Sequence, residues 1–175
     1  MNRFILGIAF AASLAIAAAT AQATSLVKID FKTLVQGASA CVVAETTRVS
    51  YAMVDGSPVT RTVFSVSKTA FGKTPKTLTV VTPGGEMKGR KVVMGEVNAG
   101  APRFLNGTES VLLLQEIADG DYAIAGYSQG VFDVVREDPE VSVRLPESQG
   151  GATSIDNALS IINRARRSTN ESVRD

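Results

Sequence analysis

The first 23 residues carry a hydrophobic pattern that sets them apart from the rest of the chain. Arg3 gives a positive start, and the run from Phe4 to Ala19 contains no charged residue. Small residues follow in Ala21-Gln22-Ala23, at the positions that a signal peptidase reads. The run is too short and too rich in alanine for a membrane span, which needs about 20 apolar residues. We therefore expect residues 1–23 to be a signal peptide and the mature protein to be exported, either periplasmic or secreted.

Beyond this segment, the spacing of apolar residues first predicts a short helix. Phe31, Leu34, Val35 and Ala38 recur at helical spacing after Asp30, an arrangement typical of one buried helix face. Asp30 is suited to the N-cap position, because its carboxylate can accept hydrogen bonds from the first turn. The helix is expected to end between residues 37 and 39.

From residue 40 onward the period changes from helical to alternating, which predicts β-strands. The turn sequences are Asp55-Gly56-Ser57-Pro58 and Asp119-Gly120-Asp121, rich in residues that favour turns. The expected strands cover residues 40–53, 59–68, 76–82, 92–94, 111–115, 122–125 and 130–136.

Short strands with meander-like turns favour a mainly β fold, here a small antiparallel OB-like barrel. The barrel is expected to occupy residues 24–138, together with the short N-terminal helix. Its expected core residues are Val42, Val43, Val63, Phe64, Val66, Leu78, Val80, Leu112, Leu114, Ile124 and Phe132.

The C-terminal part has a different character. Residues 139–153, with Pro146 and the pair Gly150-Gly151, are expected to be a linker. Ser154 can then cap an amphipathic helix that runs from Ile155 to about residue 167, followed by a tail to residue 175. We expect this helix to dock on the barrel. A helix that binds a partner or a membrane surface is the alternative.

Charge and composition exclude several classes of function. The chain has 18 basic and 17 acidic residues, and loss of Arg3 with the signal peptide leaves the mature protein formally neutral. A nucleic-acid binder normally carries a basic field, so no nucleic acid is expected as a partner. The chain has no histidine, which removes the commonest general base and transition-metal ligand. We therefore predict no enzyme activity, no metal and no cofactor.

Cys41 is the only cysteine, so the chain has no internal disulfide. We interpret it as a small buried residue. An intermolecular disulfide or a reactive thiol is the alternative.

Three stretches resemble a pattern in uncharacterised exported bacterial proteins. They are Gly100-Ala101-Pro102-Arg103-Phe104, the segment 107–114 with Glu109 before an aliphatic strand, and the segment from Tyr122 through Gln129-Gly130 to Phe132. Thr108 and Ser110 depart from the usual residues around the glutamate. The order of helix and strands over about residues 30–136 is similar to the netrin-like OB barrel of tissue inhibitors of metalloproteinases. The resemblance implies a barrel that binds proteins, with a secreted protease as one class of partner. Those inhibitors chelate zinc through an N-terminal cysteine. The mature chain here is expected to begin at Thr24, with no cysteine near it, so that mechanism is not implied.

The glycine-rich segment from Pro83 to Asn106 is the predicted binding surface, because a long loop in a small domain is usually functional. The candidate contact residues are Arg90, Arg103, Phe104, Tyr127 and Gln129. The alternative is that Phe104 plugs the barrel while Arg103 pairs with Glu96 or Glu109.

The sequence thus predicts an exported, non-enzymatic binding module with a protein partner. Two other hypotheses stay open. One is a carboxylate-based hydrolase, for which Glu109 with Asp119, or Asp133 with Glu137, would supply the acid pair. The other is an oligosaccharide or nucleic-acid binder.

Overall fold

The computed structural model describes residues 26–88, 93–96 and 98–168. The helices are α2 (Phe31–Gly37) and α3 (Ile155–Arg167), and short 3-10 turns lie at η1 (Ala118–Gly120), η2 (Tyr127–Gly130) and η3 (Glu147–Gln149). The strands are β1 (Ala40–Val54), β2 (Ser57–Phe71), β3 (Thr77–Pro83), β4 (Gly85–Lys88), β5 (Val93–Glu96), β6 (Glu109–Glu116), β7 (Tyr122–Ile124), β8 (Val131–Glu137), β9 (Glu140–Arg144) and β10 (Ala152–Thr153). Neither helix in these ranges is long and apolar enough to cross a membrane.

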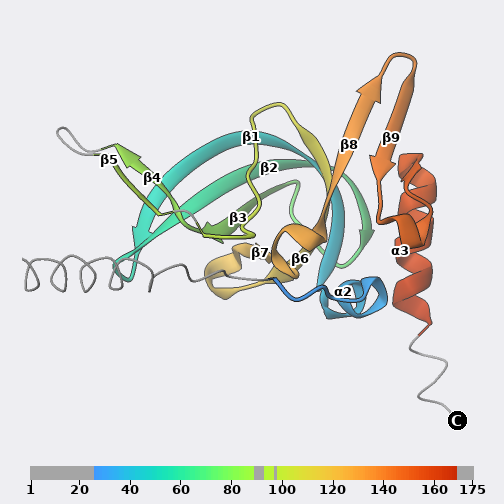
Figure 1. The fold of residues 1–175 in the computed structure, drawn as a ribbon, viewed down its shortest axis with the longest axis horizontal. Coiled ribbons are helices and arrows are strands. Elements are labelled where there is room, and N and C mark those ends of the chain that lie inside the picture. Colours follow the sequence, from blue (N-terminus) through green and yellow to red (C-terminus); the bar gives the residue numbers. More distant parts are fainter. Residues whose placement is uncertain (1–25, 89–92, 97, 169–175) are drawn as a thin grey trace, which may run out of the picture.

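Within the described ranges, eight strands form one sheet in the order β1-β2-β3-β7-β6-β8-β9-β10. β1 also pairs with β6, so that β1, β2, β3, β7 and β6 make a partial ring (Figure 1). All neighbours are antiparallel except β3 and β7, which pair in parallel through Val80 and Tyr122. The prediction of a mainly β, mostly antiparallel fold with one short N-terminal and one C-terminal helix is confirmed.

The two long strands β1 and β2 form a hairpin whose turn follows from two residues. Asp55 has φ 49° and Gly56 has φ 78°, the left-handed conformation that a two-residue hairpin turn requires at both central positions. Val54 pairs with Ser57 across this turn. The Asp-Gly dipeptide therefore predicted both the turn and the strand pairing.

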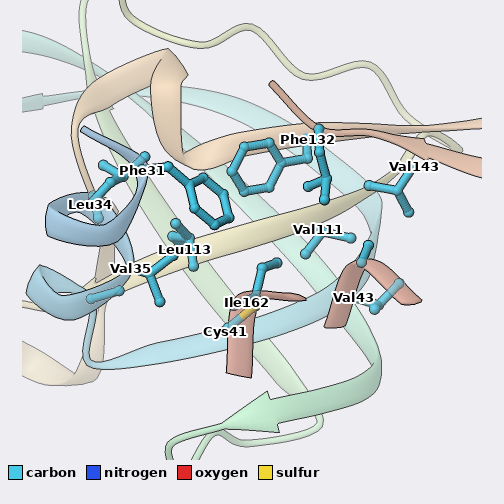
Figure 2. Packing of buried hydrophobic residues seen from close by; sticks show 14 residues of the cluster. Phe31, Leu34, Val35, Cys41, Val43, Val111, Leu113, Phe132, Val143 and Ile162 are labelled. Atoms are coloured by element: carbon cyan, nitrogen blue, oxygen red, sulfur yellow. The ribbon is translucent and has the colours of Figure 1, made fainter. Parts of the chain in front are cut away.

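β1 and β6 are buried on both faces, which divides the interior into two cores. Val42 and Leu112 point into the ring, whereas Cys41 and Leu113 point to the opposite face. The ring core consists of Ala40, Val42, Ala44, Phe64, Leu78, Val80, Phe104, Leu112, Leu114, Tyr122 and Ile124. The helix core lies beneath α2 and α3 and consists of Phe31, Leu34, Val35, Ala38, Cys41, Val43, Val111, Leu113, Ala125, Phe132, Val143, Leu145, Ala158 and Ile162 (Figure 2).

The expected core residues are buried, apart from Val63 and Val66, which are half-buried. Val43 and Phe132 belong to the helix core rather than to the ring. α2 begins as predicted, since the Asp30 carboxylate accepts hydrogen bonds from the amides of Lys32 and Thr33 at 3.0 and 3.3 Å.

α3 docks on the domain, with Ala158 and Ile162 fully buried in the helix core. The Ser154 hydroxyl caps its N-terminus by accepting a hydrogen bond from the amide of Asn157. At the other end, the guanidinium of Arg166 donates to the carbonyl oxygens of Gln36 and Ala38 at 2.6 and 2.9 Å. α3 is therefore an integral part of the packed domain.

Two segments differ from what the sequence suggested. The segment 83–106, expected to be an irregular loop with one short strand at 92–94, contains the β4–β5 hairpin. The segment 139–153, expected to be a linker, instead holds β9 and β10. β9 pairs with both β8 and β10, which extends the sheet towards α3.

Candidate functional site

Three segments that are distant in the sequence meet on one part of the surface. They are the N-terminal segment 26–29, the loop 98–104 and the turn η2. Side-chain and backbone contacts connect them pairwise, and they include four of the residues singled out from the sequence. Their exposed apolar residues Leu26, Val27 and Tyr127 are called the N-terminal patch below.

Gln129 holds the N-terminal segment against η2. Its side-chain oxygen Oε1 accepts a hydrogen bond from the amide of Ile29 at 2.8 Å, and its Nε2 donates to the carbonyl of Val27 at 3.0 Å. The amide side chain thereby offers the same donor and acceptor pair as a residue of a neighbouring strand. Gln129 is half-buried. It therefore acts as a clamp, a side chain that holds the backbone of residues 27 and 29 in place from beneath the exposed surface.

Gly100 connects the loop to the other two segments. Its carbonyl accepts a hydrogen bond from the amide of Ser128 at 3.1 Å. Its φ of +80° favours glycine, and the side chain of Leu26 fills the space that a Cβ would occupy. Glycine is therefore required here for two reasons, backbone conformation and the close approach of Leu26.

Tyr127 is held in an unusual backbone conformation. It has φ 57°, directly after Gly126 with φ 66°, and an aromatic residue in the left-handed region costs about 1 to 2 kcal/mol. Its side chain nevertheless stays 44% exposed. Residues held in such sparsely populated backbone conformations cluster at functional sites.

The remaining candidates separate into surface and core. Phe104 is buried in the ring core and meets Phe64 edge to face, with ring centroids 4.9 Å apart. Arg103 is exposed in the loop beside it. Arg90 lies outside the described residues, as does the side chain of Glu96. Phe104 therefore plugs the ring, while Arg103 remains available at the surface.

Of the acidic residues considered for hydrolysis, Glu109 has a cationic partner, whereas Asp119, Asp133 and Glu137 are exposed and have no ion pair in the described ranges. Asp121, in the same turn as Asp119, has a separate partner. Glu109 pairs with Arg136 at 2.5 Å, and its other oxygen lies 3.4 Å from the Ser67 hydroxyl. Asp121 pairs with Arg61 at 2.8 Å. In the described part of the chain, no three histidine, cysteine, aspartate or glutamate side chains gather where a metal ion would fit.

Cys41 lies in the helix core, fully buried, and this burial raises the pKa of its thiol to about 12. The thiolate is the reactive form, so the native protein is expected to resist the thiol reagent dithionitrobenzoate at pH 8. One thiol should react after denaturation. Rapid labelling of the folded protein, or a disulfide-linked dimer on a non-reducing gel, would support the reactive-thiol alternative instead.

Sequence reasoning missed Leu26 and Val27, which are 45% and 81% exposed. Two features of the sequence could have indicated them. They are an apolar pair outside any predicted element, and they follow the expected cleavage site by only two residues. Comparison with known proteins adds no further guide, since no protein-family profile, no curated protein and no solved structure matches this chain.

Proposed function

We propose that this protein is an exported, non-enzymatic binding module that engages a protein partner through the N-terminal patch. The supporting observation is the convergence of three segments that leaves Val27 and Tyr127 exposed while Gln129 fixes the backbone behind them. The partial ring is, on this proposal, an OB-like barrel. Such barrels serve as scaffolds for many ligands, so the fold alone does not select the partner.

The composition of the patch favours a protein surface as the ligand. Exposed aromatic and aliphatic side chains beside an arginine are typical of interface centres and their rims. Tyr127 supplies a large contact area with few rotatable bonds, and Arg103 lies on the loop that contacts η2. The near-neutral charge of the chain argues against nucleic acid.

Preorganisation gives the patch an energetic advantage. A terminal segment loses conformational entropy when a partner orders it, which weakens binding. The two hydrogen bonds from Gln129 already hold residues 27 and 29, so much of that loss occurs on folding. By the netrin-like resemblance, a secreted protease in the cell envelope or outside the cell is the first class of partner to test.

The test begins with a photo-crosslinking residue at position 27, expressed in the native envelope, and the same residue at position 141 as a control. Val141 is an exposed valine on β9, in the hairpin that projects away from η2 (Figure 1). A specific adduct is expected from position 27 alone.

The purified partner then serves to measure affinity. Val27→Asp combined with Tyr127→Ala should weaken binding by about tenfold or more, since central interface residues each contribute more than about 1 kcal/mol. Val141→Asp should leave affinity unchanged, and thermal unfolding should show that all variants are folded. Equal affinity of the double variant and the parent protein would place the binding surface elsewhere.

A further inference from the structure

The outward face of α3 carries a hollow of about 440 Å³ lined by Ser160, Asn163, Arg164, Arg167 and Ser168. These residues form two adjacent rows at a spacing of four residues, one of 160, 164 and 168 and the other of 163 and 167. Residues four apart lie above one another on a helix, so the hollow follows the helix axis. This face is opposite the one that buries Ala158 and Ile162.

The arginines near the end of α3 divide into two kinds. Arg166 is half-buried, and its guanidinium binds the carbonyl oxygens at the end of α2. Arg164 and Arg167 are exposed, and neither has an ion pair or a side-chain hydrogen bond with another residue in the described ranges. Two guanidinium groups with unused donors thus face the same hollow.

The hydroxyl groups of the hollow present oxygen lone pairs rather than protons. Ser160 Oγ donates its proton to the carbonyl of Asp156 at 2.9 Å, and Ser168 Oγ donates to the carbonyl of Ala165 at 3.1 Å. A well-matched ligand therefore supplies anionic groups for the arginines and N–H donors for these oxygens. A phosphate ester, whose second pKa is about 6 and which is mostly without a proton at neutral pH, meets only the first requirement.

We propose that this hollow binds an acidic segment of a protein in extended conformation. Carboxylate side chains satisfy Arg164 and Arg167, and the peptide N–H groups satisfy the serine oxygens. From residue 160 to 168 the helix rises about 12 Å, the length of roughly four residues of extended chain. Because the hollow and the N-terminal patch lie on different elements, this inference does not rest on the proposed function.

The helix end itself favours a peptide over a dense anion. The carbonyl groups at the C-terminus of α3 carry a partial negative charge, which attracts arginines and repels concentrated negative charge. Single carboxylates spaced along a peptide, each beside a guanidinium, meet this field with less repulsion than a phosphate group of nearly two charges.

The test uses the full-length protein and a fluorescent peptide of alternating glutamate and serine with blocked ends. Binding measured by anisotropy should saturate and weaken as salt rises. Arg164→Gln with Arg167→Gln should lower the affinity by about tenfold or more, because charge-assisted hydrogen bonds are lost. The same peptide with glutamine in place of glutamate should not bind.

Arg144→Gln combined with Arg48→Gln is the matched control. It removes two exposed arginines from β9 and β1 and should leave affinity unchanged. That result would show that the lower affinity of the α3 variant comes from the loss of Arg164 and Arg167 and not from a lower net positive charge. Equal affinity of the α3 variant and the parent protein would overturn the proposal. So would tighter binding of inorganic phosphate or of phosphatidylglycerol vesicles than of the peptide, with dependence on the same two arginines.

Discussion

Replacement of Phe64 by alanine is expected to lower the free energy of unfolding by about 3 to 5 kcal/mol. Phe64 is fully buried in the ring core, and Phe104 packs against it edge to face at an interplanar angle of 89°. Removal of the ring leaves a cavity that the paired strands cannot close, and Phe104 loses its partner. Urea denaturation should show a lower midpoint with an unchanged slope.

Thr62→Val is the control for this prediction, with the opposite expected direction. Thr62 and Thr46 are fully buried, and neither hydroxyl has a hydrogen-bond partner among the described residues. A buried unsatisfied hydroxyl costs about 1 to 3 kcal/mol, so valine of similar shape should leave stability unchanged or raise it. A loss from Thr62→Val as large as that from Phe64→Ala would contradict the packing described for the ring.

The parts of the fold that could be predicted are those in which neighbouring residues decide the structure. Asp30 with the apolar residues after it was sufficient for α2, and Asp55-Gly56 was sufficient for the β1–β2 turn. By contrast, β4 is four residues long and opens with Gly85, whose φ of +152° is rarely adopted by other residues. Such a strand has too few side chains for an alternating pattern, and its pairing with β5 is visible only in the folded chain.

The second core was hidden for a related reason. Val111-Leu112-Leu113-Leu114 reads as one apolar run, which indicates a strand buried on both faces, but not what covers each face. The cover is α2 together with α3, and Arg166 of α3 donates hydrogen bonds to carbonyl oxygens about 130 positions earlier in the chain. No local pattern indicates such a pair.

The candidate site shows the same division. Tyr127 was identified because Gly126 and Gly130 bound its turn, and Arg103 because it lies next to an aromatic residue in a long loop; both are exposed. The same reasoning could not separate Phe104, which is core, or Gln129, which is a clamp. Whether each side chain faces water depends on the distant segment that packs against it. Residues 27–29 contact the amide of Gln129, and Phe64 of β2 contacts the ring of Phe104.

Replacement of Arg166 by methionine is expected to lower the free energy of unfolding by about 1.5 to 3 kcal/mol, which is the range for hydrogen bonds to a charged group. The last carbonyl groups of a helix lack partners within it, and Arg166 supplies donors to those at the end of α2. Its guanidinium also lies over the ring of Phe71, 4.9 Å from the centroid, an attraction of about 0.5 to 2 kcal/mol. Methionine keeps the apolar stem and removes both interactions.

Arg167→Met is the control, because Arg167 is exposed and lies outside the contact with α2. It should change stability by no more than about 0.5 kcal/mol. Hydrogen exchange gives an independent measurement: Arg166→Met should speed exchange of the α3 amides and of the amides after Gly37, while amides in β2 and β3 keep their protection. If Arg166→Met leaves both stability and α3 exchange unchanged, apolar burial of Ala158 and Ile162 alone holds the helix, and the guanidinium contact is incidental to docking.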